Sequence, residues 1–150
     1  MADEARTARL KQFATDIRIA TLKEFRAIGF GHVGGSMSVA ETLAVLYGEV
    51  MRIDPANPRK DDRDQFIMSK GHAGPALYAT LALKGYFPVE QLETLNQNGT
   101  CLPSHCDRNK TIGVDMSNGS LGQGLSAGIG IALAARPKNN GAYRYVLLGV

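Results

Sequence analysis

Two short apolar runs constrain the fold of this chain more than any other feature of its sequence. Phe66–Met68 and Tyr143–Val150 consist mainly of apolar and aromatic residues, and each has the length of a buried strand. Longer segments with helical character precede and separate them, beginning with residues 4–28. Helices that alternate with short apolar strands favour an α/β domain in which helices flank a mainly parallel sheet.

The first helices are identified by apolar spacing and by residues typical of helix ends. Residues 4–28 carry apolar side chains at intervals of three and four, and this helix is expected to end at the glycines of GFGHVGGS. A second helix is predicted from Ser38 to about Met51, because Ser38 and Glu41 have the spacing of a capping box.

The middle of the chain combines two further helices with a long irregular segment. The helix after the first strand is expected to stop at Gly85, and a short helix is predicted from Pro88 to about Asn96. Periodicity is then lost over residues 97–117. A loop of this length in a domain is either functional or a misread element.

Composition excludes several classes of function. The 150 residues suffice for one domain, and the net charge is +3. Arg59 and Lys60 are followed directly by Asp61 and Asp62, which is typical of a solvated loop rather than of a nucleic-acid-binding patch. The longest apolar run, residues 125–135, is too short to cross a bilayer, and the polar N-terminus is unlike a secretory signal. We expect a cytoplasmic protein with no nucleic-acid or membrane partner.

The two cysteines flank a histidine but do not form a recognisable metal motif. Cys101 and Cys106 lie on either side of His105 in CLPSHC, and a zinc site would require a second Cys/His pair that the sequence lacks. In a reducing compartment, two free thiols are expected. No metal ligand is assigned within the chain.

The segment GSLGQGLSAGIGIALAAR contains the glycine spacing of a dinucleotide-binding turn, but its context argues against that function. Residues 113–120 (GVDMSNGS) are typical of a turn rather than a strand, and no acidic residue follows Ala127. Ser120 and Gln123 have capping-box spacing, which predicts that a helix begins at Leu121. Two interpretations remain: a small-residue helix that only packs, or a helix whose start, after Asn118 and Gly119, lies against a ligand.

All three histidines lie in turns at the edges of expected elements. His32 is followed by glycines in GHVGG, His72 lies in KGHAG, and His105 lies in PSHCD. An imidazole in such a turn can hydrogen-bond or exchange a proton with a hydroxyl-rich or phosphorylated substrate. A lone histidine of this kind is commonly structural, but the shared setting favours a common site.

Three motifs now identify a resemblance. GFGHVGGSMSVAE, DPANPRKDDRDQFIMSKGHAGPALYA and SNGSLGQGLSAGIGIALA occur in the order and spacing of the N-terminal part of transketolases, and the similarity covers nearly the whole chain. The resemblance implies a thiamine-diphosphate-binding fold, with residues 1–150 forming the module on the diphosphate side. It also implies a transferase that passes a two-carbon glycolaldehyde unit from a ketose or ketose phosphate to an aldose or aldose phosphate, as in pentose phosphate metabolism.

The resemblance assigns a role to each histidine. His32 matches the family histidine near the reacting centre, His72 matches one that contacts the cofactor diphosphate, and His105 matches one that hydrogen-bonds the terminal hydroxyl of the donor. A short segment matches the family residues that line the cofactor: Gly119, Ser120 and Leu121.

Two departures from the single-chain family pattern point to a partner. Val33 and Cys106 stand where single-chain members have proline, and both variants resemble shorter transketolases whose diphosphate and pyrimidine modules are separate chains. The resemblance therefore implies that the partner is a pyrimidine-binding module or subunit, in a dimer or heterotetramer. It also implies Mg²⁺, held by a Gly-Asp-Gly motif expected after Val150, so that residues 1–150 would be a truncated module.

Other activities remain open on the sequence alone. Deoxyxylulose-phosphate synthases share the first histidine motif, although SLGQGLSAGIGIALA favours transketolase. A specialised sugar or sulfosugar transketolase, or a non-catalytic paralogue with a regulatory role, would carry the same motifs.

Overall fold

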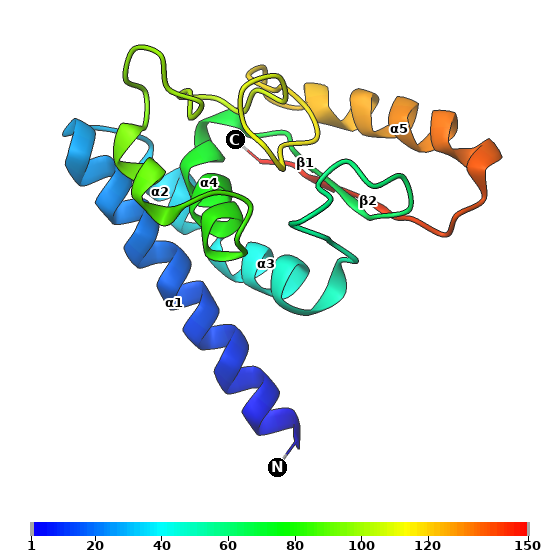
Figure 1. The fold of residues 1–150 in the computed structure, drawn as a ribbon, viewed down its shortest axis with the longest axis horizontal. Helices are drawn as coiled ribbons and strands as arrows, with labels where there is room; N and C mark the ends of the chain where they lie inside the picture. The colour runs from blue at the N-terminus through cyan, green and yellow to red at the C-terminus, as the bar shows by residue number, and fades with distance from the viewer. Residues whose placement is uncertain (1, 150) are drawn as a thin grey trace.

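Helix α1 (Ala2–Ile28) is the longest element, and its N-terminal half extends away from the rest of the molecule (Figure 1). The computed structural model describes residues 2–149. Ile17, Thr21 and Phe25 are buried along one face of α1, which packs on α3 and α4, as expected from their helical spacing. The helix ends where Gly29 adopts a left-handed φ of 80° and its N–H bonds to the Phe25 carbonyl at 2.8 Å. The prediction of a helix ending at these glycines is confirmed.

The second predicted helix is divided and begins earlier than its sequence pattern indicates. Helix α2 (Val33–Met37) is followed by α3 (Ala40–Val45) and a π-helical turn, η1 (Leu46–Val50). The capping-box prediction at Ser38 is wrong, because Ser38 has helical dihedrals and its hydroxyl donates to the Gly35 carbonyl at 3.0 Å. Glu41 instead pairs with Arg18 of α1 at 2.6 Å.

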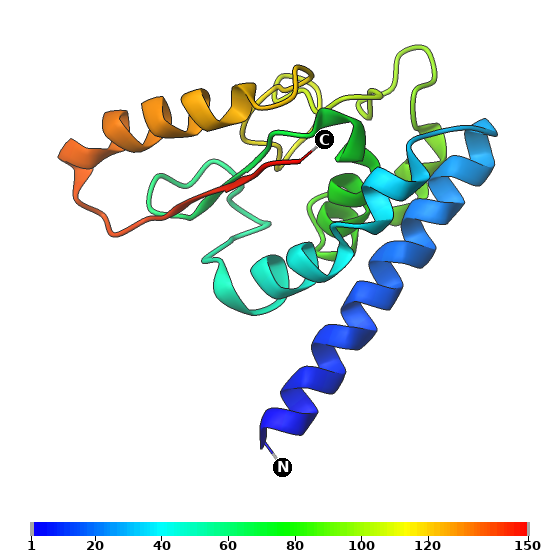
Figure 2. The ribbon, with the colours of Figure 1, turned by 180° about the vertical axis from the view of Figure 1, so that it is seen from behind.

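Both predicted strands form, and they pair in parallel. Strand β1 (Gln65–Met68) lies beside β2 (Arg144–Leu147), with Gln65 opposite Arg144 and Met68 opposite Leu147. Helix α5 (Gln123–Ala135) runs alongside this pair in both ribbon views (Figures 1 and 2). Its contacts are made by glycines: a Cβ at Gly124 would lie 2.6 Å from Ser69 Cβ, and one at Gly128 would lie 2.5 Å from Val146 Cγ2.

Helix α4 (Gly74–Leu83) is the central helix of the core. It follows β1 through a short 3₁₀ turn, η2 (Gly71–Ala73), and its residues 74–82 are all buried. Its end has the pattern of a Schellman motif: the N–H of Gly85 bonds to Ala82 and that of Tyr86 to Leu81. Gly85 has a φ of 85°, so its predicted role as the helix stop is confirmed.

The segment after α4 is less regular than the sequence predicts. The expected helix from Pro88 is a 3₁₀ helix, η3 (Val89–Thr94), and Pro88 itself has extended backbone with a ψ of 139°. Residues 97–117 contain neither helix nor strand, in agreement with the loss of periodicity. A backbone hydrogen bond closes part of this loop, because the Asn118 N–H donates to the Cys106 carbonyl at 3.0 Å.

The chain ends in a 3₁₀ turn and the second strand. The turn η4 (Arg136–Lys138) follows α5 directly and precedes β2.

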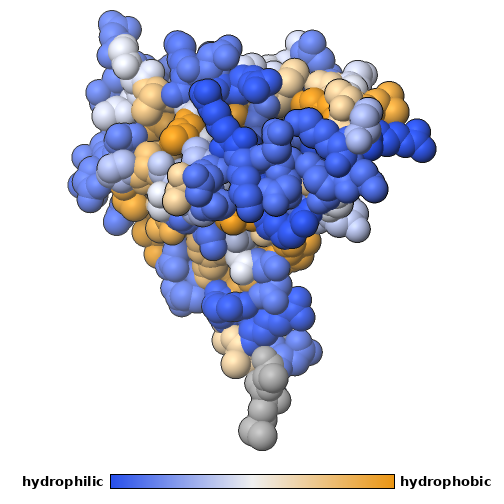
Figure 3. Space-filling view, turned by 45° about the vertical axis from the view of Figure 1, so that its right-hand side comes forward, coloured by the Kyte–Doolittle hydropathy of each residue, from blue (hydrophilic) through white to orange (hydrophobic). Residues whose placement is uncertain are grey.

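Hydrophilic residues cover the middle of the molecular face shown in Figure 3, and apolar side chains form separate patches on it. Within the described residues, no helix is both long and apolar enough to cross a membrane.

Candidate functional site at the carboxyl end of the first strand

The three histidines come from three separate segments and meet in one place. His32 precedes α2, His72 lies in the 3₁₀ turn after β1, and His105 lies in the long loop. The ring centroid of His32 is 5.2 Å from that of His72 and 6.3 Å from that of His105. His32 and His105 are exposed, whereas His72 is half-buried. The structure thus brings together the candidates that sequence reasoning grouped.

Two glycines make this convergence sterically possible. A Cβ at Gly35 would lie 2.7 Å from His72 Cδ2, and a Cβ at Gly71 would lie 2.4 Å from the Asn118 carbonyl oxygen and 3.0 Å from His105 Cδ2. Any larger residue at either position would displace an imidazole or the loop backbone. The motifs GHVGG and SKGHAG therefore contain glycines that allow the histidine rings to approach.

Lys70 is a site residue that sequence reasoning did not single out. It follows β1, only 6% of it is exposed, and its ammonium donates to the Ser38 hydroxyl at 3.1 Å. Its stem packs at the end of β2, because a Cβ at Gly149 would lie 2.9 Å from Lys70 Cδ. In the sequence, Lys70 could have been identified by its position between a buried strand and a histidine turn. A lysine buried there requires an anionic or polar partner for its ammonium group.

The electrostatics of the cluster favour a neutral imidazole at His72. Desolvation lowers the pKa of His72, and the nearby Lys70, His32 and His105 lower it further. An uncharged His72 has one N–H donor and one acceptor nitrogen. It can therefore donate a hydrogen bond to an anion while the positive charge of the site comes from Lys70.

The segment proposed to line a cofactor lies beside this cluster and is open to solvent. Gly119, Ser120 and Leu121 are all exposed, and a Cβ at Gly119 would come within 3.9 Å of His105 Cδ2. Helix α5 begins at Gln123, after Gly122 with a left-handed φ of 81°. The predicted helix start at Leu121 and the capping box at Ser120 are therefore wrong.

The first N–H groups of α5 bond to a hydroxyl that is remote in sequence and to a local carbonyl, and no local side chain caps the helix. The Gly124 N–H donates to the Ser69 hydroxyl at 2.9 Å, and the Gln123 N–H donates to the Ser120 carbonyl at 3.3 Å. Ser69 thus fastens α5 to the carboxyl end of β1. The side chain of Ser120 does not cap the helix and is exposed to solvent.

Two buried polar atoms around the cluster have no hydrogen-bond partner in the described part of the chain. They are the hydroxyl oxygen of Ser36 in α2 and the side-chain carbonyl oxygen of Asn118, whose residues are 0% and 6% exposed. Such orphaned groups are costly unless a ligand or water satisfies them. Together with the Lys70 ammonium and the exposed backbone at Gly119, they fit a large polar cofactor with an anionic end.

Neither cysteine forms a disulfide, and Cys106 is an inert buried thiol. Both are free thiols, and Cys106 is buried beneath α4, where a Cβ at Gly74 would lie 3.2 Å from its sulfur. Burial raises the pKa of Cys106 to about 12, so it is an unreactive thiol at neutral pH. Among residues 2–149, no group of three or more His, Cys, Asp or Glu side chains is positioned to hold a metal ion.

Comparisons with curated proteins give two relatives that are named as subunits. The chain is 55% identical over 140 residues to the 6-deoxy-6-sulfo-D-fructose transketolase subunit SqwG of Clostridium sp. (strain MSTE9), covering 93% of this chain and 51% of that protein. It is 41% identical over 119 residues to one subunit of the apulose-4-phosphate transketolase of Phocaeicola vulgatus, covering 79% of this chain and 42% of that protein. The chain thus spans about half the length of these relatives.

Solved structures give the same fold. A transketolase variant from Pichia stipitis matches with a TM-score of 0.87 at 31% identity, over 95% of this chain and 22% of that one. The transketolase of Leishmania mexicana matches with a TM-score of 0.84 at 35% identity, over 91% and 22% of the two chains. The expected thiamine-diphosphate-binding α/β fold is therefore confirmed.

Residues 10–145 match the family described as the transketolase thiamine diphosphate binding domain. This match includes all three histidines, Lys70 and the segment from Gly119 to Leu121. The chain belongs to the transketolase family and carries its thiamine-diphosphate-binding domain.

Proposed function

We propose that this chain is the diphosphate-side module of a transketolase that moves a two-carbon glycolaldehyde unit from a ketose donor to an aldose acceptor. The observation that carries the proposal is the convergence of the three histidines. The ring centroid of His32 lies 5.2 Å from that of His72 and 6.3 Å from that of His105. The family match over residues 10–145 supports the same activity. Residues 1–150 are assigned to one module of this enzyme.

Bound thiamine diphosphate would supply a nucleophilic carbanion that attacks the ketose carbonyl and a thiazolium ring that acts as the electron sink, so that the C2–C3 bond could break. The residues of this chain bind and orient the reactants. His72 donates a hydrogen bond to the diphosphate, and its lowered pKa keeps it available as a neutral donor. The Lys70 ammonium would offset diphosphate charge, and the exposed backbone of Gly119–Leu121 would line the cofactor.

The two exposed histidines are assigned to the substrate. His32 holds or moves a proton near the reacting carbon, and His105 hydrogen-bonds the terminal hydroxyl of the donor. Their exposure supports this assignment, because a sugar has to reach both rings. The imidazole group suits hydrogen bonding and proton exchange with hydroxyl groups near neutral pH.

The proposal includes a partner and a metal. A pyrimidine-binding module or subunit completes the site, as the relatives named as transketolase subunits suggest, and the assembly is a dimer or heterotetramer. Mg²⁺ accompanies the diphosphate, and no ligand for it is assigned among the described residues. The location is the cytoplasm, and the metabolic setting is carbohydrate metabolism of the pentose phosphate type.

A sulfonated sugar is a second candidate donor. The relative named for 6-deoxy-6-sulfo-D-fructose transketolase is 55% identical to this chain, against 41% for the relative named for apulose 4-phosphate. Comparing kcat/KM for 6-deoxy-6-sulfo-D-fructose and fructose 6-phosphate decides between these donors. A kcat/KM higher for the sulfonated sugar supports this candidate, and a tenfold preference for the phosphate rules it out.

The activity is tested with the complete protein and its co-expressed pyrimidine-binding subunit. Transfer from a ketose donor to an aldose acceptor should require thiamine diphosphate. His105→Ala should lower kcat/KM by about 10²-fold, the usual effect of losing an orienting or acid–base group. Asn98→Ala, in an exposed part of the same loop, is the matched control.

The outcomes separate the assigned roles. His72→Ala should chiefly weaken cofactor affinity, and an effect on sugar KM alone would contradict the diphosphate role. Unchanged kinetics for His105→Ala would remove His105 from the site. A well-folded assembly that transfers no two-carbon unit from any ketose would favour a non-catalytic paralogue.

A further inference from the structure

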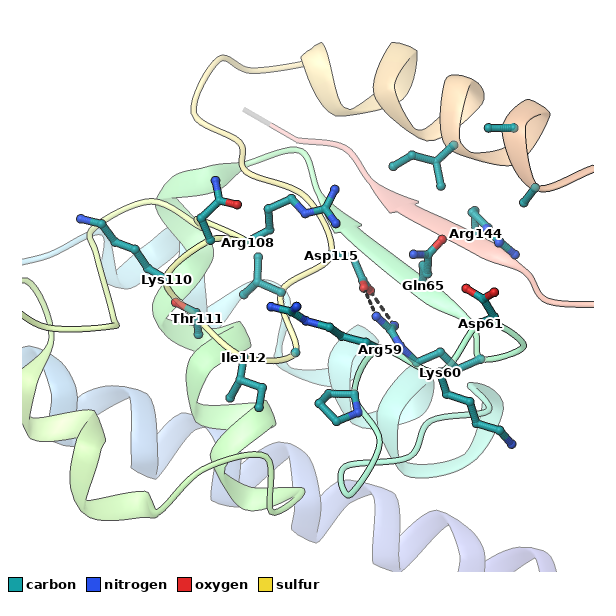
Figure 4. Close-up of a pocket in the computed structure, with 18 of the residues that line it drawn as sticks. Arg59, Lys60, Asp61, Gln65, Arg108, Lys110, Thr111, Ile112, Asp115 and Arg144 are labelled. Atoms are coloured by element: carbon teal, nitrogen blue, oxygen red, sulfur yellow. Dashed lines mark hydrogen bonds and ion pairs between the residues drawn. The ribbon is translucent and has the colours of Figure 1, made fainter.

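A cavity of about 840 Å³ lies at the end of the sheet opposite the histidines. It is lined by the loop before β1, the loop over residues 108–115, the last turns of α5 and the start of β2 (Figure 4). Gln65 and Arg144 are the first residues of their strands and line it, whereas Lys70 and His72 follow the last residue of β1. The cavity is therefore separate from the candidate active site.

The lining of this cavity is strongly basic. Seven of its residues are Lys or Arg and two are Asp, a formal excess of five positive charges. The partial negative charge at the carboxyl end of α5, about half an elementary charge, offsets only a small part of this. In Figure 4 the side chains of Lys60 and Lys110 extend outward, so the charge within the cavity comes chiefly from arginines.

The two carboxylates that face the cavity are already engaged. Asp115 pairs with Arg63 and also accepts the Phe66 N–H at 2.9 Å, while Asp61 pairs with Lys138 at 2.8 Å. Arg59 and Arg108 have no carboxylate within 4.0 Å in the part of the chain that the structure describes. These guanidinium groups are free to bind an anion.

Two buried guanidinium N–H groups beside the cavity lack an acceptor. The Nε atoms of Arg63 and Arg144 are buried without a hydrogen-bond partner among the described residues. Other nitrogens of both side chains are held in place, since Arg63 donates to the Asp64 carbonyl at 3.0 Å and Arg144 to the Ala142 carbonyl at 2.6 Å. Both side chains are therefore fixed in the wall of the cavity, where they contribute positive charge.

We propose that this cavity binds a phosphorylated small molecule at a site distinct from the thiamine-diphosphate site. Its volume falls in the range of about 300–1,000 Å³ that small-molecule sites occupy. Planar guanidinium groups match phosphate oxygens in paired hydrogen bonds, which favours phosphate over a single carboxylate.

Calorimetry with inorganic pyrophosphate tests this site on the complete protein with its partner subunit. Saturating thiamine diphosphate is present throughout, so that the histidine end is already occupied. Pyrophosphate should bind with one equivalent per chain, and the double variant Arg108→Gln/Arg144→Gln should weaken it by about tenfold or more, as expected for losing charged hydrogen bonds. Arg26→Gln, an exposed arginine in the last turn of α1, is the charge-matched control and should leave affinity within about twofold.

Thermal melting establishes that each variant is folded, and Arg59→Gln on the exposed rim replaces the double variant if that one is unstable. Three results would overturn the proposal: no binding to the saturated wild type, an equal loss in Arg26→Gln, or equal affinity for citrate. Loss of the partner subunit from the arginine variants with unchanged pyrophosphate affinity would also overturn it, because the cavity would then belong to a protein interface.

Discussion

His72 packs directly over Gly35, so closely that a Cβ at Gly35 would lie 2.7 Å from His72 Cδ2 and 2.8 Å from Nε2. Gly35 lies in α2 and His72 follows β1, so this contact joins two segments separated by α3, η1, the following loop and β1. The position of one imidazole therefore depends on the absence of a side chain in another helix.

This contact predicts the effect of Gly35→Ala. The added methyl group should displace the His72 ring and weaken thiamine diphosphate affinity by about tenfold, the loss of one charge-assisted hydrogen bond. Gly34→Ala is the matched control, because a Cβ at Gly34 meets nothing within 4 Å in the same helix. Equal cofactor affinity in the two variants, measured by calorimetry on the complete assembly, would contradict the role of His72 at the diphosphate.

Lys70 gives a second prediction about the cofactor. Its ammonium is almost buried and reaches only the Ser38 hydroxyl among the described side chains. Lys70→Met keeps the packing of the stem but removes the charge, so thiamine diphosphate should bind about tenfold more weakly, with a smaller difference at high salt. Lys23→Met, an exposed lysine on α1, should change affinity little. A cofactor titration at two salt concentrations would measure both effects.

Glu24 predicts an unusual dependence of stability on pH. Glu24 is 0% exposed, and neither of its carboxylate oxygens has a hydrogen-bond partner among the described residues. Desolvation raises the pKa of this carboxyl well above 4.5. Because the folded pKa lies above the unfolded one, this group favours folding below about pH 4.5, and that stability is lost as pH rises through the folded pKa.

Glu24→Gln removes this titration. The variant should melt a few degrees higher than wild type near pH 8 and show a smaller difference near pH 4.5. Thermal melts across this pH range measure the effect, with Glu93→Gln as an exposed control. If the melting temperatures of the wild type and of Glu24→Gln depend on pH in the same way, Glu24 has a hydrogen-bond partner.

Two glycines of α5 predict opposite effects of the same substitution. Gly128→Ala should destabilise the fold by about 1–3 kcal/mol, because its Cβ would lie 2.5 Å from Val146 Cγ2. Gly130→Ala should stabilise it by about 0.5–1 kcal/mol, because that position meets nothing within 4 Å and alanine is the better helix former. Urea unfolding measures both. A stabilised Gly128→Ala variant would mean that α5 does not pack closely on β2.

Much of the architecture follows from local sequence patterns. The apolar runs at Phe66–Met68 and near Val146 are strands because short apolar segments are stable only when a sheet satisfies their backbone. Gly29 and Gly85 end their helices because each adopts a left-handed φ that other residues rarely tolerate. The glycine spacing in α5 also predicted close packing, which Gly124 and Gly128 confirm and Gly130 does not.

The helix starts could not be derived in the same way. Ser38 and Ser120 have capping-box spacing, yet neither caps a helix. The chain before Ser38 is already helical, and the N–H groups at the start of α5 are satisfied partly by Ser69, which is remote in sequence. A local motif predicts a cap only where no tertiary partner competes for the same groups.

The sequence by itself determined the two strands, the ends of two helices, the three histidine turns and the family resemblance, because these depend on residue types and their spacing along the chain. Only the tertiary structure decided which side chains meet. It brought His32, His72 and His105 together, buried Lys70 and Glu24, and collected arginines from distant segments into one cavity. These relationships depend on how α2, the long loop and α5 pack around β1, and contacts across such separations leave no local pattern in the sequence.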